Sequence, residues 1–407
     1  MAIDNKDKKI LNVPHLRFPE FTGEWKKCII GELTTKVGSG VTPRGGEAVY
    51  KSEGHPFVRS QNVGLGHLIL DDVAYIDEDT HQRQKNTELQ LDDVLLNITG
   101  ASIGRSTLVN QQIVGGNVNQ HVCIIRANKK LIPSFLCNFL LSQYGQKQIE
   151  SFQAGGNRQG LNFEQIKSIK IGLPSVEEQK KIADLLLLIE QRITTQNKII
   201  EDLKKLKSAI IESHYNQTEK QTVFIADLGE PFNVGNLSKD DLSEAGNPCI
   251  IYGELFTTYG ETISQIESHT NKKEGMTLSK KGDLLFPTST TVDAISLIAP
   301  SVINVDGVIL GGDMFGIHIS TNFNAQYLSY YFNHIAKRQL AKFAKGSTII
   351  HLHYTDIEKA RLLLPSLEEQ NKMANCLISL DEKIRVEKSY LQLLDKQKAY
   401  LLRQMFI

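Results

Sequence analysis

Two long segments of the chain carry apolar residues at alternating spacings of three and four. The spacing continues without a break from near Ser175 to near His214, and again from near Ser366 towards the end of the sequence. Such a heptad pattern predicts two helices, each of about 37 residues, that pair along one apolar seam. The predicted seam residues are Ile182, Leu186, Ile189, Ile193, Ile200 and Leu203 in the first segment, and Met373, Leu377, Leu380, Ile384, Leu391 and Leu394 in the second.

Both segments begin with nearly the same residues. Leu-Pro-Ser-Val-Glu-Glu-Gln at 173–179 returns as Leu-Pro-Ser-Leu-Glu-Glu-Gln at 364–370, an offset of 191 residues. Proline in a first turn and carboxylates near the positive end of a helix both favour a helix start. Polar residues interrupt the seams at matching places, Gln196 with Glu387 and Lys207 with Lys398. Such interruptions fix the register of paired helices, whereas an amphipathic helix on an ordinary core is the simpler alternative.

The repeat extends upstream of the helices. Weaker matches relate 152–166 to 343–357 and 54–56 to 246–248, so the chain is two copies of one plan rather than a solenoid. The predicted parts are an N-terminal segment (1–23), a first globular domain (24–172), a central helix (173–215), a second globular domain (222–363) and a C-terminal helix (364–407). The short linker between helix and second domain predicts an antiparallel coiled coil with one domain at each end.

Each globular part has short strand-like runs followed by helical patterns. In the first copy the strands are expected at 93–98 and 121–126, and the helices at 132–142 and 144–152. The fold class is therefore α+β, with two tandem domains, many loops and a pseudo-two-fold internal repeat.

Composition restricts the class of protein. Of the 407 residues 41% are apolar and 23% charged, and no apolar run reaches the length of a membrane helix. The first twenty residues carry no apolar signal core, so a cytoplasmic protein is expected. Five cysteines without a CxxC spacing argue against a disulfide framework or structural zinc, and are interpreted as small buried residues. The net charge is zero, but residues 121–172 hold seven basic and two acidic groups.

Glycine-rich polar loops are the candidate binding elements. Arginine, asparagine and glutamine can read base edges, although polar loops are also common without any ligand. The segment 155–162 is the strongest candidate because it closes the basic stretch, and 345–351 is its counterpart with different chemistry. The candidate DNA-binding residues are Thr42, Arg44, Arg59, Gln61, Asn62, Thr99, Ser102, Arg105, Asn157, Arg158, Gln159 and Asn162 in the first copy, and Tyr252, Thr288, Ser289, Thr290, Lys345, Ser347, Thr348 and His351 in the second.

Signals of catalysis are missing from the sequence. Residues 100–106 are one residue short of a phosphate-binding loop and lack its lysine, and HExxH and GxGxxG do not occur. His351 and His353 alternate without nearby acidic or cysteine ligands, so polar contacts are favoured over a metal site. Neither catalytic nor metal-binding residues are predicted.

This layout resembles the DNA specificity subunit of type I restriction-modification systems. The resemblance rests on 13–25, on the two Leu-Pro-x-x-Glu-Glu-Gln motifs and on 155–162, and covers essentially the whole chain. It implies two target-recognition domains that each read half of a bipartite double-stranded DNA sequence, and a coiled coil that sets the spacer. It also implies two methyltransferase (modification) subunits that bring S-adenosylmethionine, and restriction or translocase subunits that use ATP and Mg²⁺. The chain itself would be a non-enzymatic subunit without a cofactor.

Two other classes remain open at this point. One is a scaffold protein whose coiled coil holds two protein-binding modules, and the other is a stand-alone methyltransferase. The second would need a cofactor motif that the sequence lacks, and a DNA-binding assay with partner subunits would separate the first from a DNA reader.

Overall fold

The chain divides into two compact units. The computed structural model describes residues 12–43, 45–153 and 160–407. Unit 1 comprises the chain up to Asn197 together with Ser389–Ile407, and unit 2 comprises Lys198–Lys388. Both divisions fall inside long helices, α5 (Val176–Gln217) and α11 (Leu367–Gln404), so each helix contributes to both units.

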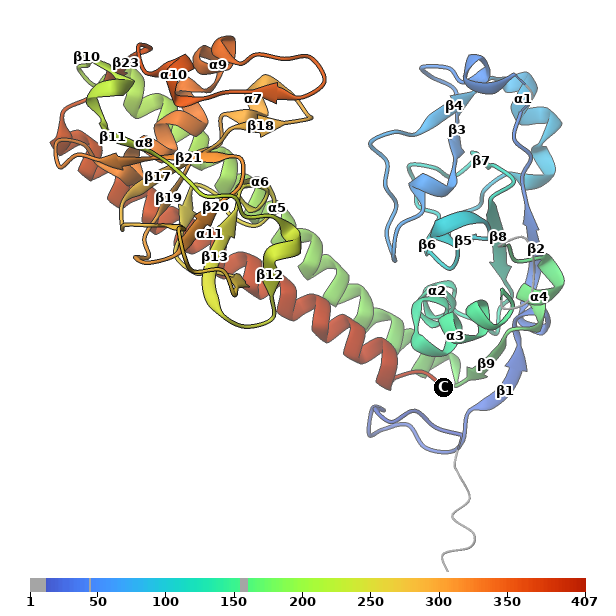
Figure 1. The fold of residues 1–407 in the computed structure, drawn as a ribbon. Helices are drawn as coiled ribbons and strands as arrows, with labels where there is room; N and C mark the ends of the chain where they lie inside the picture. The colour runs from blue at the N-terminus through green and yellow to red at the C-terminus, as the bar shows by residue number, and fades with distance from the viewer. Residues whose placement is uncertain (1–11, 44, 154–159) are drawn as a thin grey trace, which may run out of the picture. The chain divides into compact units, whose positions relative to one another are not determined.

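Unit 1 contains two main sheets in its described part. The larger has the order β2-β8-β5-β6 and the smaller β4-β3-β7, while β1 pairs with β9 at the entry to α5. Figure 1 shows α2 on one side of the larger sheet and the smaller sheet on the other. The bounds are β1 Lys26–Ile29, β2 Thr34–Ser39, β3 His55–Val58, β4 Ala74–Ile76, β5 Val94–Asn97, β6 Ser106–Leu108, β7 Asn117–Val118, β8 Val122–Ala127, β9 Lys170–Leu173, α1 Glu78–Arg83, α2 Pro133–Leu141, α3 Gln143–Ser151 and α4 Phe163–Ser168.

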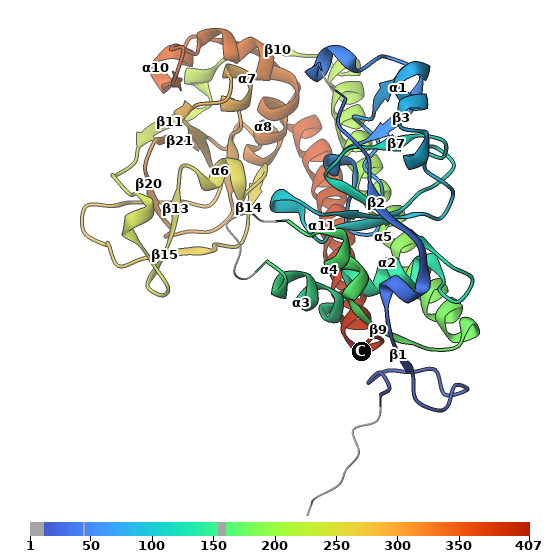
Figure 2. The same cartoon turned by 90° about the vertical axis from the view of Figure 1, so that its right-hand side faces the viewer.

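Unit 2 repeats this arrangement with more strands. One sheet has the order β11-β21-β17-β19-β14, a second has β12-β15-β13-β20-β16, and β10 pairs with β23 at the entry to α11. Figure 2 shows α8 next to the sheet that contains β11 and β21. The bounds are β10 Gln221–Phe224, β11 Gly229–Asn233, β12 Leu242–Ser243, β13 Asn247–Ile251, β14 Thr262–Ile263, β15 Ser268–Thr270, β16 Thr277–Leu278, β17 Asp283–Pro287, β18 Ser289–Thr290, β19 Ser301–Ile303, β20 Ile309–Gly311, β21 Met314–Ile319, β22 Ile350–His351, β23 Arg361–Leu364, α6 Glu254–Thr257, α7 Ala294–Leu297, α8 Ala325–Tyr331, α9 Lys337–Leu340 and α10 Tyr354–Ile357.

The central strands occupy equivalent places in the strand order of the two units. In unit 1, β5 lies between β8 and β6, and in unit 2, β17 lies between β21 and β19. The same interaction links the paired central strands, because Arg126 of β8 binds Asp93 at 2.7 Å and His318 of β21 binds Asp283 at 2.6 Å. The predicted α+β repeat is therefore present. The two strands and the two helices expected between residues 93 and 152 are present as well.

The repeated Leu-Pro-Ser-x-Glu-Glu-Gln motif ties each long helix to its unit. Gln179 is fully buried, its amide donates to the Pro174 carbonyl at 3.1 Å, and its Oε1 accepts from the Ile132 amide at 2.8 Å. Gln370 makes the same two contacts, with the Pro365 carbonyl and the Asn324 amide. The motif therefore fixes the start of each helix against the segment that leads into α2 or α8.

All twelve predicted seam residues of the two long helices are at least partly buried. Eight of the twelve are buried, and Ile193, Leu203, Leu380 and Leu391 are half-buried. Two of the four polar interruptions, Lys398 and Lys207, meet partners on the other long helix. Lys398 contacts Glu190 in unit 1, and in unit 2 Lys207 binds Asp381 at 2.6 Å. In unit 2, α5 and α11 run in opposite directions, since His214, further along α5, meets Glu369, earlier in α11.

The last turn of α11 and the residues that follow it complete the core of unit 1. Leu401, Met405 and Phe406 are buried with residues of α2, β5, β8 and the first turns of α5. The Phe406 ring lies 5.1 Å from that of Phe135. The core of unit 1 is therefore assembled from segments that are far apart in the sequence.

The cysteines follow the sequence interpretation only in part. Cys123, Cys137 and Cys249 are buried and Cys28 is half-buried, but Cys376 is exposed on α11. The interpretation as buried residues is therefore wrong for Cys376, which lies on the outward side of the heptad pattern. No group of three or more possible metal ligands is found within residues 12–43, 45–153 and 160–407. Within the same ranges, no helix combines the length and apolar character needed to span a bilayer.

Candidate nucleic-acid interface

A hollow in unit 1 brings together four of the predicted binding residues. Gln61, Thr99, Ser102 and Arg105 line a space of about 440 Å³ together with Ser60, Gly100, Ala101 and His121. The residues come from the segment after β3, the turn after β5 and the residue before β8. Arg105 is exposed and makes no ion pair with any residue that the structure describes. Its guanidinium is therefore available to an acceptor from outside.

The turn after β5 is held in one conformation by the backbone and by a neighbouring side chain. Gly100 and Gly104 have φ values of +73° and +86°, in the region that favours glycine. The Gln146 amide donates to the Gly104 carbonyl at 3.0 Å, and Asn97 Nδ2 donates to the Ser60 carbonyl at 2.8 Å. The polar groups at the hollow thus project from a fixed loop, which is what base reading requires.

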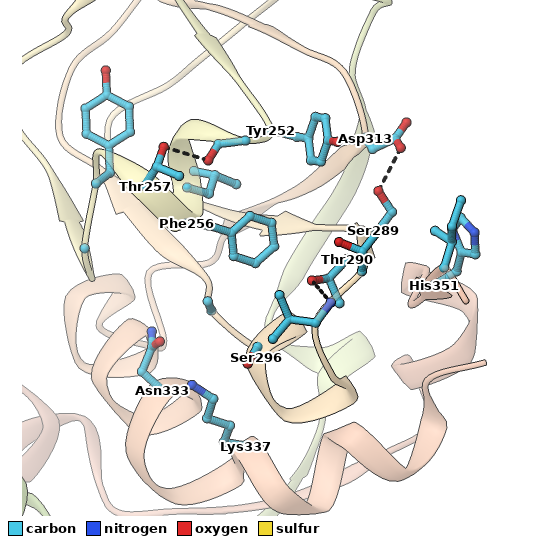
Figure 3. Close-up of a pocket in the computed structure, with 18 of the residues that line it drawn as sticks. Tyr252, Phe256, Thr257, Ser289, Thr290, Ser296, Asp313, Asn333, Lys337 and His351 are labelled. Carbon is cyan, nitrogen blue, oxygen red and sulfur yellow. Dashed lines mark hydrogen bonds between the residues drawn. The ribbon is translucent and has the colours of Figure 1, made fainter. Parts of the chain in front are cut away.

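Unit 2 has a larger hollow at the corresponding place. Its volume is about 810 Å³, and predicted residues Tyr252, Ser289, Thr290 and His351 line it. Figure 3 shows the Phe256 ring between Thr257 and Thr290, with Asn333 and Lys337 on the helical side of the pocket. Tyr252 and Phe256 are each 37% exposed, so both rings offer surface for stacking.

The two hollows occupy equivalent positions in the repeat. Thr99 follows the end of β5 by two residues and Ser289 follows the end of β17 by two residues, while His121 and Asp313 immediately precede β8 and β21. The Thr99 hydroxyl lies 2.6 Å from His121 Nδ1, and the Ser289 hydroxyl donates to Asp313 Oδ2 at 2.8 Å. One hydroxyl thus orients one polar side chain in each unit.

The described end of the first candidate segment, residues 160–162, and the second candidate segment, 345–351, border these hollows. Gly160 forms a β-bridge with Thr99 and the Leu161 amide donates to the Ile98 carbonyl at 2.9 Å. In unit 2, His351 pairs with Ser289, and the Leu352 amide donates to the Thr288 carbonyl at 3.0 Å. Arg44, Asn157, Arg158 and Gln159 lie outside the described residues, so their assignment stays a prediction.

Three predicted residues are buried or are bonded within the protein. Asn62 is 1% exposed and its side chain is bonded to the Arg59 amide and to the Ile69 and Asp72 carbonyls. Asn162 caps α4, because its Oδ1 accepts from the Gln165 amide at 2.8 Å. Thr288 is 8% exposed. The three assignments stay predictions, since loop chemistry alone does not distinguish an amide that reads a base from one that satisfies the backbone.

The other predicted residues differ in their exposure and in their contacts with the rest of the protein. Arg59 and Gln61 both bind Asp72, at 2.9 and 2.6 Å. Lys345 pairs with Asp356 at 2.5 Å, while Ser347 and Thr348 are exposed and Thr42 is half-buried outside either hollow. The sequence reasoning missed His121, Asp313, Phe256 and Lys337. Aligning the strand ends of the two copies was the signal that could have found His121 and Asp313.

The model of the type I restriction modification DNA specificity domain matches this chain twice, over residues 22–205 and 217–396. The chain belongs to this family. Family membership agrees with the repeat and identifies the protein as a specificity subunit, a DNA-recognition component without a catalytic role. The expectation of a restriction-modification subunit is therefore confirmed.

Relatives of this specificity subunit carry the same description. A putative type I restriction enzyme MjaX specificity subunit of Methanocaldococcus jannaschii is 22% identical over 405 residues, covering 93% of this chain and 92% of that one. The EcoKI specificity subunit of Escherichia coli is 22% identical over 208 residues, covering 47% of this chain and 42% of the relative.

Solved structures share the fold of this specificity subunit. The type I S subunit from M. genitalium superposes with a TM-score of 0.59 at 15% identity, covering 97% of this chain and 99% of that one. A chain from a study of assembly and conformational transition of the type I R-M system gives 0.57 at 16% identity, covering 93% and 96%.

Proposed function

We propose that this chain is the sequence-specific reader of a type I restriction-modification complex, in which each unit recognises one half of a bipartite DNA target. The observation that carries this proposal is the pair of equivalent hollows. They have the same backbone frame and the same orienting hydroxyl, but different side chains in the reading position, His121 in one and Asp313 in the other. A common frame with different polar groups is what two readers of two different sequences need.

The second part of the proposal is that α5 and α11 pair as an antiparallel coiled coil and set the spacer between the half-sites. Each helix is continuous through both units, with 42 residues in α5 and 38 in α11. The buried seam supports helix pairing. The contacts of Lys398 with Glu190 and of Lys207 with Asp381 support one fixed register, because a misaligned helix would leave these partly or fully buried charges unpaired.

The third part concerns protein partners. Exposed apolar residues occupy matching positions on the two long helices: Val176 with Leu367, Leu187 with Ile378, and Ile199 with Tyr390. All are between 37% and 53% exposed. A duplicated apolar surface suits two copies of one partner. We therefore propose two methyltransferase subunits as the partners on these helices.

In this assembly, S-adenosylmethionine belongs to the methyltransferase subunits, and ATP and Mg²⁺ belong to restriction or translocase subunits. The basis is that this sequence lacks the motifs for these cofactors. The net charge of zero fits a reader that shares its grip on the phosphates with its partners.

The deciding experiment exchanges one unit. The chain is produced with its cognate methyltransferase subunits, and residues 24–172 are replaced by the corresponding segment of another specificity subunit. Methylome sequencing should show a new first half-site, with the second half-site and the spacer unchanged. A folded chimera that alters both half-sites would refute independent readers. A wild-type complex that binds random duplex as well as its methylated motif would favour the scaffold alternative.

A further inference from the structure

One position in each unit combines a fixed orientation with access to the hollow. It is the residue directly before β8 or β21, occupied by His121 in unit 1 and Asp313 in unit 2. Its partner is the hydroxyl of Thr99 or Ser289, at 2.6 and 2.8 Å. The frame is shared, and only the chemistry of the oriented group differs.

In unit 2 the oriented group can only accept hydrogen bonds. Asp313 is exposed, and its Oδ2 accepts from Ser289. No residue within 12–43, 45–153 and 160–407 donates to its Oδ1. Figure 3 shows the carboxylate beside Ser289, on the same side of the pocket as His351. One oxygen is thus held by the protein, and the other is left for a donor from outside.

The surroundings of Asp313 indicate that its carboxylate discriminates between bases and does not add general affinity for DNA. Lys337 and His351 line the same pocket, and among the residues that the structure describes neither forms an ion pair with Asp313. A carboxylate near a nucleic acid is repelled by the phosphates and by the carbonyl oxygens of guanine and thymine. It is favoured only where an exocyclic amino group, N4 of cytosine or N6 of adenine, donates to it.

We propose that this shared position is a specificity determinant. Asp313 accepts a hydrogen bond from the exocyclic amino group of a cytosine or adenine at one position of the second half-site. The inference rests on the proposed DNA-reading function and assigns a residue and a base chemistry to it. His121, a ring with two nitrogens, is not restricted to accepting and gives the first unit a different preference at the equivalent place.

The test replaces the carboxylate by an amide of the same shape. Asp313→Asn keeps an acceptor for Ser289 but adds a donor and removes the charge. The variant complex with its methyltransferase subunits is assayed on duplexes in which every position of the second half-site carries each of the four bases. We expect one position to lose roughly 5- to 150-fold of its discrimination against guanine and thymine. Affinity for random duplex should rise, because a repulsive charge has gone.

The two sources of the amino group are separated in the same panel. If the wild-type complex accepts only cytosine at the affected position, the ligand is cytosine N4, and if it accepts only adenine, the ligand is adenine N6. Asp240→Asn removes an exposed carboxylate of unit 2 that lies outside the hollow, and serves as the charge-matched control. It should leave the target sequence unchanged.

A gain-of-function variant guards against a folding defect. His121→Asp places a carboxylate opposite the Thr99 hydroxyl and should introduce a requirement for cytosine or adenine at one position of the first half-site. An unchanged target in both Asp313→Asn and His121→Asp, with wild-type methylation intact, would overturn this inference alone. Equal losses on target and random duplex for Asp313→Asn would assign Asp313 to folding. Absence of sequence-specific binding by the wild-type complex would instead refute the proposed function.

Discussion

Removing the charge of Lys207 should destabilise unit 2 in a way that depends on pH. The side chain of Lys207 is only 6% exposed, and its ammonium group binds Asp381 at 2.6 Å and Glu261 at 3.2 Å. The Tyr330 hydroxyl donates to the same Asp381 at 2.6 Å, and His334 lies 2.9 Å from Glu261. Lys207→Met keeps the length of the side chain, so the change isolates the charge.

The magnitude follows from the burial of the ion pairs that Lys207 forms. Breaking a fully buried ion pair costs about 3 to 5 kcal/mol. The carboxylates of Asp381 and Glu261 are 31% and 24% exposed, so the expected loss is smaller, about 2 to 4 kcal/mol. The pKa of Glu261 sets an upper bound on the part of this loss that comes from Glu261. Burial raises this pKa, but the hydrogen bond from His334 and the charge of Lys207 outweigh burial and lower it to about 2 from 4.5. That difference corresponds to about 3 kcal/mol for all partners of Glu261 together, of which Lys207 accounts for only a part.

The sign of the pH dependence is fixed by that lowered pKa. A carboxyl with a lower pKa in the folded chain stabilises the fold above its unfolded value near 4.5, and loses that contribution as the pH falls towards 2. Without Lys207 the pKa of Glu261 rises, so the variant has less to lose in acid. The difference in unfolding free energy between wild type and Lys207→Met should therefore shrink as the pH falls from about 4.5 towards 2.

Urea denaturation with two probes measures this effect. Circular dichroism follows both units, and the single tryptophan, Trp25, reports on the core of unit 1. Lys207→Met should lower the urea concentration at the midpoint of the dichroism transition. The midpoint of the transition that Trp25 fluorescence follows should stay unchanged. Lys205→Met, which removes a 70% exposed lysine paired with Glu201, is the control and should leave both transitions in place. A loss below about 0.5 kcal/mol for Lys207→Met, or a loss that grows in acid, would refute the reasoning.

Three further results are expected. Phe406→Ala should lower the unfolding free energy of unit 1 by about 3 to 5 kcal/mol, and with it the midpoint of the Trp25 transition, because the ring fills the core of unit 1. An unchanged midpoint would mean that this core packs without the Phe406 ring. Four residues inserted after both Ile193 and Ile384 should add about 6 Å and lengthen the preferred spacer by one or two base pairs. An unchanged optimum in a folded complex would show that the helices do not set it. Arg105→Ala should weaken target binding by about 1 to 3 kcal/mol, and equal weakening on random duplex, with a smaller salt dependence, would reassign Arg105 to a phosphate.

The sequence was most informative where a pattern repeated. The helix starts near Ser175 and Ser366 agree with the observed starts at Val176 and Leu367, because proline, acidic residues and heptads all favour the same boundary. The strands around 94–97 and 122–127 were also predictable from apolar runs and alternation. Local pattern and tertiary packing agree in these segments.

The site was only partly predictable, for a physical reason. Thr99, Ser102 and Arg105, predicted as binding residues of one loop, line one hollow, but Asn62 and Asn162 use the same polar chemistry to satisfy the backbone. A side chain's partner depends on which loops the sheet brings together, and that information is not local. The correspondence of His121 with Asp313 became visible only when strand ends were aligned.

The position of residues 401–406 in the core of unit 1 has a consequence for the order of events during synthesis. Unit 2 is one continuous stretch, Lys198–Lys388, and can fold as soon as that stretch has left the ribosome. Unit 1 begins earlier in the chain but lacks Leu401, Met405 and Phe406 until about 200 more residues have been translated. The unit translated first is therefore finished last. Its unfilled apolar surface at α2 is exposed throughout that interval, which makes unit 1 the part of the nascent chain most exposed to aggregation and most in need of chaperone protection.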